Sequence, residues 1–480
     1  GKEQWRDGKG HSAGSWEGWV LVKRRVLGRG GLAAPSGRCG DGIPVLFKVG
    51  VPGKANRDSG CQQQGRLLSA GTVGFIHRQV IIAGAGIAGL WTLRRLLAAG
   101  YDAILLEREA IGAGQTLGAQ GILHGGVKYG LDGSNRDIAA RLRELPPLWH
   151  ECLAGNRGPS LAEARTLSPC QHLWAAGSWL SQVGATVGVR AMQGEVRRLD
   201  REAWPSALRD GGHKGAVYEL RETVLEVKSV LRALAAPVRD RIFHSGPLQF
   251  EMCPDGGLAA LACGGARLTA DVFLFTAATG NEAAAEALGL GPGVTQRRPL
   301  KQIMVRGKLP LLYGHGVTVS PKPVATITSH PLENEIVWYL GAGVAEDGAS
   351  MSDEKAVINA RRKLSEMFPA LDFSSMLWAC WSVDRAEPNA ASRLPDGPAL
   401  LEQGNAALAW PAKLVYAPVL AEKALDFTAA RLPPAFDALS SMTAVIPPAA
   451  PVPLPLAEMG AYPWETADWQ PAVSEAPAPP

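Results

Sequence analysis

Three glycines and one acidic residue have the types and the spacing of a nucleotide-binding turn. The glycines follow the pattern G-x-G-x-x-G directly after an apolar run: Gly84, Gly86 and Gly89. Gly84 allows a tight turn, Gly86 lets the backbone approach a pyrophosphate, and Gly89 lets a helix lie close to a strand. Glu107, 18 residues after Gly89, can accept hydrogen bonds from both hydroxyls of a ribose. These residues predict a site for a dinucleotide.

The flanking sequence predicts the elements that would position this turn. Residues 80–83 form an apolar run of the kind expected for a strand that is buried on both faces. After the turn, leucines fall on one face of a helix: Leu90, Leu93, Leu96 and Leu97. Gly100 is a suitable helix stop, and residues 101–106 predict a second strand that leads into the acidic residue. The N–H groups at the helix start, around Ile87 and Ala88, would face the phosphates.

The composition excludes several classes of protein. Hydrophobic residues make up 46% of the 480 residues, as in an ordinary globular protein, and no run of about 18 uncharged apolar residues predicts a membrane span. The net charge of +4 arises in residues 1–72, which hold twelve Lys or Arg against five Asp or Glu. The rest of the chain is slightly acidic and has no basic stripe for nucleic acid. The seven scattered cysteines form no CxxC pair, which argues against a metal knuckle and favours a reducing, cytoplasmic compartment.

The two ends of the chain differ in composition from the middle. Residues 1–72 are basic and glycine-rich, and we expect an unstructured N-terminal extension there; the alternative is a targeting segment. Residues 442–480 form a tail dominated by Pro and Ala, a composition typical of extended, unpacked chain. Trp464 and Trp469 could still dock on the folded part. Folding is expected to begin within residues 73–77.

The middle of the chain alternates between strand and helix patterns. Runs of apolar or β-branched residues predict strands at residues 272–276, 303–306, 324–329 and 336–340. Amphipathic patterns predict helices at residues 137–152, 227–234 and 352–368. Together they indicate a parallel α/β layer that is interrupted by a mainly antiparallel β region.

Further motifs follow the glycine turn along the chain. Residues 112–129 contain the run G-A-G-Q-T-L-G-A-Q-G-I-L-H-G-G-V-K-Y, and residues 271–280 form an apolar strand that ends in A-A-T-G. Residues 337–343 lead from a strand into a turn of small residues. Near the end, V-D-R-A-E-P at residues 383–388 is followed by R-L-P-D-G-P, and residues 404–414 contain A-W-P-A-K-L.

Together with the turn, these motifs resemble those of the D-amino-acid oxidase and glycerol-3-phosphate dehydrogenase group of FAD-dependent oxidoreductases, over roughly residues 77–430. The resemblance implies a Rossmann-like FAD-binding domain interleaved with a mainly antiparallel β substrate domain, the glutathione-reductase-like FAD fold. It places the FAD-binding domain at residues 77–150, 215–292 and 380–430, and the substrate domain at residues 151–214 and 293–379.

The resemblance also implies FAD as the cofactor and a set of residues that contact it. In the family, the glycine turn and the acid hold the ADP half, a Ser or Thr meets the pyrophosphate, and the HGG stretch lies beside the flavin. A helix that starts near Pro411 would face the flavin with its positive end. Carried over to this sequence, the predicted contacts are Gly84, Gly86, Ile87, Ala88, Gly89, Glu107, Arg108, Thr116, Gln120, Gly121, His124, Pro247, Ala278, Gly280, Trp410 and Lys413.

Three residues are candidates for handling the substrate. Arg385 could bind a carboxylate or phosphate through two points, or could form a surface salt bridge to Asp384 or Glu387. His124 could act as a base or simply satisfy a hydrogen bond beside the flavin. Lys128 could meet an anionic substrate, or could be a solvated lysine. No metal site is expected.

The sequence therefore predicts an FAD-dependent oxidase or dehydrogenase that removes a hydride equivalent from a small amine, amino acid or hydroxy acid. The flavin would be reoxidised by oxygen, a quinone or an electron-transfer partner, because no second dinucleotide turn is found. Two alternatives stay open: an NAD-dependent dehydrogenase that uses the same turn, and a flavin-binding protein without turnover. The expected partner is a small-molecule substrate, with no nucleic acid and no transmembrane segment.

Overall fold

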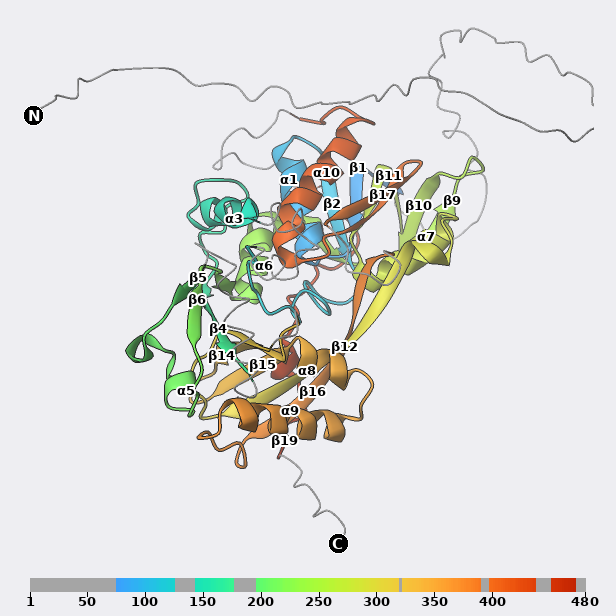
Figure 1. Ribbon diagram of the computed structural model, residues 1–480. Coiled ribbons are helices and arrows are strands. Elements are labelled where there is room, and N and C mark those ends of the chain that lie inside the picture. Colours follow the sequence, from blue (N-terminus) through green and yellow to red (C-terminus); the bar gives the residue numbers. More distant parts are fainter. Residues whose placement is uncertain are drawn as a thin grey trace, which may run out of the picture. The chain divides into compact units, whose positions relative to one another are not determined.

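The computed structural model describes residues 75–125, 143–176, 196–318, 322–389, 397–436 and 450–471 (Figure 1). The predicted N-terminal extension at residues 1–72 and the candidate Lys128 lie outside these residues. Within them, no helix is both long enough and apolar enough to cross a membrane.

A mainly parallel sheet carries the glycine turn. Its five parallel strands lie in the order β18 (Ala406–Trp410), β11 (Ala266–Phe275), β1 (Phe75–Ala83), β2 (Ala103–Glu107) and β8 (Ile242–His244). Antiparallel strands extend it: β17 (Ala399–Gln403) pairs with β18, and the hairpin of β9 (Gln249–Met252) and β10 (Leu258–Cys263) pairs with β11. β1 therefore lies at the centre of the sheet, and its carboxyl end leads directly into the turn.

Side chains alternate across β1 and enter two different cores. Val80 and Ile82 pack with three helices: α1 (Ile87–Ala98), α6 (Val227–Ala235) and α10 (Ala417–Ala429). Ile81 and Ala83 pack in the core on the other face of the sheet, which includes side chains of α7 (Asn281–Ala287). All four side chains are almost completely buried. The apolar run of the sequence is thus a strand that is covered on both faces, as predicted.

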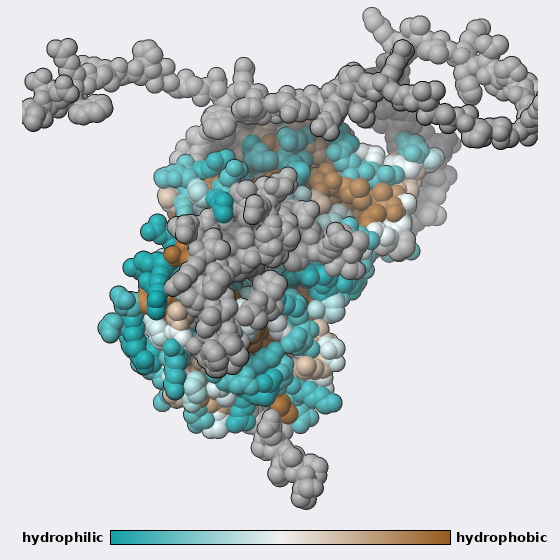
Figure 2. Space-filling model, in the orientation of Figure 1, coloured by the Kyte–Doolittle hydropathy of each residue, from teal (hydrophilic) through white to brown (hydrophobic). Residues whose placement is uncertain are grey.

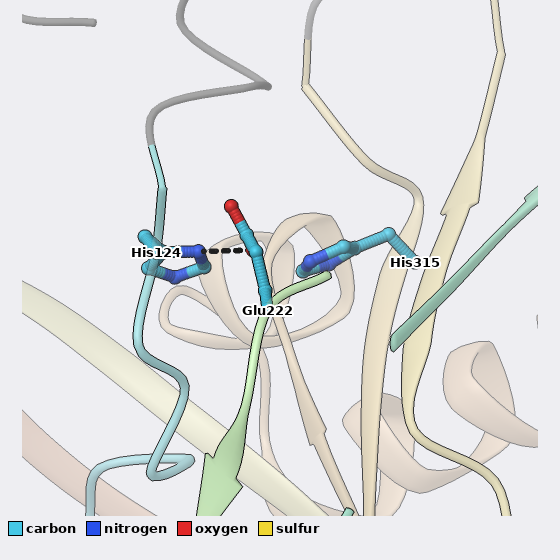
Figure 3. Close-up of side chains that lie close together, drawn as sticks. All are labelled: His124, Glu222 and His315. Carbon is cyan, nitrogen blue, oxygen red and sulfur yellow. Dashed lines mark hydrogen bonds and ion pairs between the residues drawn. The ribbon is translucent and has the colours of Figure 1, made fainter. Parts of the chain in front are cut away.

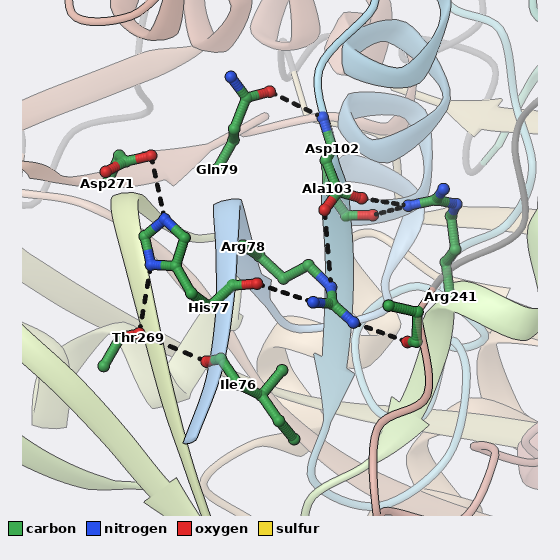
Figure 4. Close-up of polar contacts among 10 residues, drawn as sticks. Ile76, His77, Arg78, Gln79, Asp102, Ala103, Arg241, Thr269 and Asp271 are labelled. Atoms are coloured by element: carbon green, nitrogen blue, oxygen red, sulfur yellow. Dashed lines mark hydrogen bonds and ion pairs between the residues drawn. The ribbon is translucent and has the colours of Figure 1, made fainter. Parts of the chain in front are cut away.

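Buried arginines hold the amino ends of β1 and β2 together, at the end of the sheet opposite the turn (Figure 4). Nη1 of Arg241 donates to Oδ1 of Asp102 over 2.8 Å, and Nε of Arg78 lies 3.7 Å from Oδ2 of the same carboxylate. The side-chain oxygen of Gln79 accepts the backbone N–H of Asp102. Because both guanidinium groups are buried, the pairing with Asp102 offsets their desolvation and also fixes the relative position of the two strands.

A second, mainly antiparallel sheet follows the order β19 (Gln470–Pro471), β16 (Leu377–Pro388), β12 (Thr295–Gly307), β15 (Ile336–Gly341), β14 (Ala325–Pro331), β13 (Gly314–Val317), β4 (Gln171–Ala175), β6 (Val217–Leu220) and β5 (Val196–Arg198). Helices α8 (Gly343–Gly348) and α9 (Asp353–Met367) pack against it. The remaining α-helices and strands of the described chain are α3 (Leu145–Leu153), α5 (Ser206–Arg209), β3 (Thr166–Ser168) and β7 (Val224–Leu225). In Figure 2, the visible face over this second sheet is mainly hydrophilic.

The two sheets confirm the predicted combination of a parallel α/β layer with an interrupting antiparallel region. The helix predicted at residues 352–368 is α9, where the hydroxyl of Ser352 accepts the backbone N–H of Lys355 as an N-cap. For the helix predicted at residues 137–152, the described part is α3, and residues 126–142 lie outside the described chain.

The sheets divide the chain differently from the predicted domain limits at two places. β6 lies within residues 215–292, and the first half of residues 380–430 includes most of β16, yet both strands belong to the second sheet. Strand pairing decides this membership: β6 pairs with β4, and β16 pairs with β12 along twelve residues of each. The predicted domain assignment remains a proposal.

The prediction of an unpacked tail over residues 442–480 is wrong for residues 450–471, because this segment contacts both sheets. Leu456 bridges to Phe243 of β8, and β19 pairs with the edge of β16. The rings of Tyr462 and Trp464 are buried and stacked on each other, with centroids 4.2 Å apart. Aromatic burial therefore outweighs the extended tendency of the surrounding prolines.

A hydrogen bond from Tyr462 fixes this segment to α6. Its hydroxyl donates to Oε1 of Glu226 over 2.5 Å and accepts the backbone N–H of Lys228. Glu226 is buried, and Oε2 of its side chain also accepts the backbone N–H of Ser229, which caps α6. The tail thus supplies a donor to a carboxylate that burial would otherwise disfavour.

Replacing Tyr462 by Phe should lower the free energy of unfolding by about 1–3 kcal/mol, because the variant leaves Glu226 and the Lys228 N–H without this partner. Urea unfolding at pH 7 measures the change. Gln470→Ala is the control, since Gln470 is exposed and bonds within the same segment, and should change stability by less than about 0.5 kcal/mol. Equal effects of both variants would show that the Tyr462 hydroxyl has no special role.

His330 makes another contact with the tail, and this contact is sensitive to pH. Its ring lies 4.1 Å from that of Trp464, between Tyr339 and Tyr462, and Nε2 contacts the hydroxyl of Thr328. Burial lowers the pKa of His330 to about 3, although the charge of Glu226 partly opposes this shift. The folded protein therefore holds a neutral imidazole at pH values at which the unfolded chain binds a proton.

Stability should consequently fall as the pH drops below about 6.5, by up to about 1.4 kcal/mol per pH unit from this residue alone. The His330→Gln variant should be less stable than the wild type at pH 7.5 but should show a flatter slope between pH 6.5 and 4.5. Urea unfolding at intervals of half a pH unit provides the comparison. The prediction fails if the two slopes coincide.

Candidate active site

The turn after β1 leaves no room for a side chain at two of its glycines. A Cβ on Gly84, where φ is +100°, would lie 2.6 Å from the Cα of Ala277. A Cβ on Gly89 would lie 2.0 Å from the carbonyl oxygen of Gly84. At Gly86 the nearest atom would be the hydroxyl oxygen of Thr116, at 2.9 Å. The turn, the start of α1 and the end of β11 are therefore in backbone contact, and this contact exposes the N–H groups at the start of the helix.

Glu107 lies at the carboxyl end of β2, beside the turn. Its Oε2 accepts the backbone N–H of Ala85 over 2.7 Å, and its Oε1 accepts that of Glu109 over 2.9 Å. Burial raises the pKa of Glu107 above its ordinary value, and these backbone hydrogen bonds partly oppose the shift. Each oxygen keeps a further lone pair, so the carboxylate is held in place and can still accept hydrogen bonds from a ligand.

A cavity of about 1090 Å³ extends from this turn to the second sheet. Its walls come from the turn, residues 113–122, the carboxyl end of β11, the strands β12 and β16, and residues 409–414. Nearly all predicted site residues line it: Gly84, Gly86, Ile87, Ala88, Glu107, Arg108, Thr116, Gln120, Gly121, His124, Pro247, Ala278, Gly280, Arg385, Trp410 and Lys413. Gly89 lies beneath the turn instead. What each of these residues binds remains a prediction.

Several polar residues of this cavity region were not predicted. The hydroxyl of Thr276 donates to the carbonyl oxygen of Gly84 over 2.9 Å and so ties the end of β11 to the turn. The side-chain oxygen of Asn281 accepts the backbone N–H of Ala277, and its amide donates to the carbonyl oxygen of Ala409. Their position at the end of a buried strand, next to the A-A-T-G run, is a signal that could have identified them.

The second sheet adds charged residues from strands β12 and β16. Arg298 and Arg385 are cross-strand neighbours, and both line the cavity. Glu387, which is 1% exposed, accepts from Nε of Arg298 over 2.8 Å and lies 4.0 Å from Nε of Arg385. Asp384, the other acid considered as a partner for Arg385, instead pairs with Arg297. Arg298 could not be predicted, because its proximity to Arg385 depends on the strand register.

The start of the C-terminal helix differs from the prediction. Helix α10 begins at Ala417, not near Pro411, and a short 3-10 turn, Leu414–Tyr416, precedes it. Ala412 has a φ of +60° and Lys413 is extended, so neither residue can belong to a right-handed helix. Lys413 lines the cavity from a loop, and a positive helix end at Pro411 is not available to a ligand.

His124 lies on the loop that enters the cavity from residues 112–121. Its Nδ1 is 3.2 Å from Oε2 of Glu222, and the same carboxylate accepts the backbone N–H of Gly125 over 2.8 Å. Glu222 was not predicted, because it lies 98 positions further along the chain and belongs to no motif. Lys128, the third catalytic candidate, is outside the described residues.

The geometry of the cavity fits FAD. Its turn end combines the N–H groups at the start of α1, of which that of Ile87 donates to the hydroxyl of Thr116 over 3.2 Å, with a fixed carboxylate. This combination suits a pyrophosphate and a ribose. The volume of about 1090 Å³ is at the upper limit for small-ligand pockets, so the cavity has room for a dinucleotide and for part of a substrate.

Comparison with known proteins agrees with this fit. A family model described as FAD dependent oxidoreductase matches residues 79–404. The chain belongs to this family. It is 36% identical over 353 residues to a probable FAD-dependent oxidoreductase of Pseudomonas aeruginosa, a match that covers 72% of this chain and 90% of the relative.

Solved structures show the same fold. The crystal structure of that Pseudomonas aeruginosa protein aligns with a TM-score of 0.67 and 32% identity, over 82% of this chain and 98% of the other. Glycine oxidase from Geobacillus kaustophilus aligns with a TM-score of 0.53 and 17% identity, over 75% and 97%. L-α-glycerophosphate oxidase from Mycoplasma pneumoniae, solved with FAD bound, aligns with a TM-score of 0.53 and 14% identity, over 74% of this chain and 95% of the other.

The predicted family, fold class and cofactor are therefore confirmed: the chain is an FAD-dependent oxidoreductase with FAD as its cofactor. The family favours FAD over the alternative of an NAD-dependent dehydrogenase, and an enzyme over a flavin-binding protein without turnover.

In this FAD-dependent oxidoreductase, Gly84→Ala should reduce the FAD content of the purified protein, with an affinity for FAD lower by at least about 10-fold. The added methyl group would meet the backbone of β11 and displace the turn. Gly256→Ala is the matched control: its φ is +86°, so it has a similar backbone cost of about 1–2 kcal/mol, but its Cβ would meet nothing within 4 Å. Fluorescence titration with FAD measures both. Equal FAD binding by the two variants would contradict the role of Gly84.

Proposed function

We propose that this enzyme oxidises a small substrate in which an anionic group lies near a carbon that bears an amine or a hydroxyl group. The observation that carries the proposal is the placement of Arg298 and Arg385 on adjacent strands, in the wall of the same cavity that begins at the dinucleotide turn. Guanidinium groups bind carboxylates and phosphates through two parallel hydrogen bonds. A substrate bound there would extend from the second sheet toward the cofactor.

The arrangement around Glu387 leaves Arg385 the better placed of the two arginines. Nε of Arg298 is 2.8 Å from the Glu387 carboxylate, whereas Nε of Arg385 is 4.0 Å away and about one third of its side chain is exposed. An incoming anion can therefore contact Arg385 without displacing the closer ion pair. Glu387 would then hold the two guanidinium groups in place rather than neutralise the substrate site.

The structural neighbours support an anionic substrate. They include a glycine oxidase, an iminodiacetate oxidase, an L-amino acid deaminase and an L-α-glycerophosphate oxidase. Glycine, iminodiacetate and amino acids carry a carboxylate beside an amine-bearing carbon, and glycerophosphate carries a phosphate near a hydroxyl-bearing carbon. Since these neighbours share only 14–17% identity with this chain, they support the class of substrate and not a particular compound.

The residues of the chain would bind and orient the substrate, while FAD, when bound, supplies the acceptor for a hydride equivalent. Arg385 would fix the anionic end, and the apolar ring of Trp381, which packs on Gly118, would exclude water from the reacting carbon. His124 and Lys128 remain candidates for contact with the reacting group. Oxygen, a quinone or an electron-transfer partner would then reoxidise the cofactor. We also propose a cytoplasmic location, which the buried thiols of Cys152 and Cys263 support.

Anaerobic titration of the FAD-loaded enzyme tests the proposal. Amino acids, N-substituted amino acids, 2-hydroxy acids and glycerol phosphate are compared with the corresponding amides, amines and alcohols, and loss of the yellow colour of oxidised flavin is recorded. We expect at least one anionic compound to bleach the enzyme and its neutral analogue to fail. Arg385→Gln should weaken binding of the active compound about 10- to 100-fold, corresponding to the loss of a charged hydrogen bond.

Arg267→Gln provides the control, because Arg267 pairs with Glu251 away from the cavity, and this variant should behave as the wild type. Bleaching by neutral amines that does not depend on Arg385 would overturn the proposal of an anionic substrate.

A further inference from the structure

Two histidines and one glutamate from distant parts of the chain meet at the cavity (Figure 3). His124 lies on the loop after residues 112–121, Glu222 lies between β6 and β7, and His315 lies on β13. Figure 3 shows the Glu222 carboxylate between the two imidazole rings, which face it from opposite sides. One ligand atom of each residue lies within 4.8 Å of those of the other two, and both histidines line the cavity.

The distances are close to those of a metal centre. Nδ1 of His124 and Oε2 of Glu222 are 3.2 Å apart. For a tetrahedral ion with bonds of about 2.0–2.1 Å to imidazole nitrogen and carboxylate oxygen, neighbouring ligand atoms are about 3.3 Å apart. The imidazole rings have centroids 6.1 Å apart and are inclined by 25°. Small side-chain rotations would therefore bring the three ligand atoms around a single ion.

His315 and Glu222 are oriented by hydrogen bonds of the kind that accompanies metal ligands. Nδ1 of His315 contacts the hydroxyl of Thr326 at 2.7 Å, which directs Nε2 toward the site when Nδ1 carries the proton. Oε1 of Glu222 accepts the backbone N–H of Gly125 over 2.8 Å, and Oε2 accepts the side-chain amide of Gln171 over 3.1 Å. Both carboxylate oxygens are thereby fixed, and each retains a lone pair.

The buried carboxylate of this cluster favours a positive ligand. Glu222 is 4% exposed and His315 is 1% exposed, so the carboxylate is removed from water. In the described part of the chain, the ion-pair partner of Glu222 is the imidazole of His124 rather than a Lys or Arg. Hydrogen bonds and a nearby cation both stabilise a buried carboxylate, and a bound metal ion would add the second of these.

We propose that His124, Glu222 and His315 bind one divalent ion of a first-row transition metal, with Zn²⁺ as the simplest case. Two imidazoles and one carboxylate suit such ions, whereas Mg²⁺ and Ca²⁺ prefer oxygen ligands alone. Three protein ligands leave at least one coordination position open, and this position faces the cavity because His124 and His315 line it. His124 is then a metal ligand, not the base considered from the sequence.

The metal site goes beyond the proposed function and does not depend on it. Two neutral imidazoles, one carboxylate and a divalent ion together carry a charge of +1. The open position would therefore attract an electron-rich atom of a ligand, such as a hydroxyl or carboxylate oxygen or an amine nitrogen. The sequence gives no signal for this site, because the three ligands are about 90–100 positions apart and have no common spacing.

A second cluster on the same sheet provides a built-in comparison. Cys170, His172 and Glu219 also place ligand atoms within 4.8 Å of one another, at β4 and β6. These residues are half-exposed and lie away from the cavity, and Glu219 is paired with Arg197 over 3.0 Å. A carboxylate that already has a guanidinium partner is a poorer metal ligand than one without such a partner. We therefore expect a tightly bound ion at the cluster of His124, Glu222 and His315.

The test uses the full chain, loaded with FAD and purified without a histidine tag. The protein is treated with a chelator and dialysed against Zn²⁺ at defined free concentrations, and bound zinc is measured by mass spectrometry. The wild type and His172→Gln should each bind one equivalent. Glu222→Gln and His315→Gln should weaken binding by more than about 100-fold, and Thr326→Val, which removes the orienting hydroxyl, by about 10- to 100-fold.

The FAD content and the unfolding midpoint of each variant show whether it is folded, and Thr326→Val keeps the proposal testable if a ligand variant is not. Zinc retained by Glu222→Gln but lost by His172→Gln would overturn the assignment in favour of the second cluster. A wild type that binds no zinc at micromolar concentrations would overturn it in favour of a shared proton. Because no substrate is added, neither result depends on the proposed reaction.

Discussion

The close approach of three backbone segments at the glycine turn is the constraint on which the structure depends. The carbonyl oxygen of Gly84 occupies the space that a Cβ on Gly89 would need, and the end of β11 does the same for Gly84. Only this contact allows α1 to start immediately at the end of β1 and leave its first N–H groups facing the cavity. The hydrogen bond from Thr276 to Gly84 then closes the turn against the neighbouring strand.

The two ends of the cavity are built by different physical means. At the turn, the polar groups that face the cavity are backbone N–H groups and one carboxylate, which backbone hydrogen bonds hold at the carboxyl end of a parallel strand. At the second sheet, they are side chains of antiparallel strands, held by ion pairs such as that of Arg298 with Glu387. Backbone groups stay the same when a sequence changes, whereas side chains do not. A fold of this kind can therefore keep the end that its backbone builds while the side chains of the other end change.

Local patterns explain how much could be predicted. Residues that are close in sequence determine the turn, both flanking strands and the position of Glu107. The fold class of the protein was therefore predicted correctly. Arg298, Glu222 and His315 could not be predicted, because strand register and sheet order bring them to the cavity. The packing of the tail was predicted only in part: its Pro- and Ala-rich composition favoured an unpacked chain, although Trp464 was named as a residue that could dock. The start of α10 was misplaced because the left-handed φ of Ala412 has no signal in an alanine.

The packing of the segment 450–471 has a consequence for synthesis on the ribosome. The central sheet needs β18, and the tail contacts β8 and β16, so the chain cannot complete its cofactor end until nearly all of it has been translated. Until then the carboxyl end of β11 has an unpaired edge, since β18 pairs there and β10 pairs only with the amino end. Such an intermediate can aggregate through its unpaired strand edge, and chaperones can bind it. A nascent chain that stops before residue 406 would carry the complete glycine turn and still lack β18, the strand that pairs with the carboxyl end of β11.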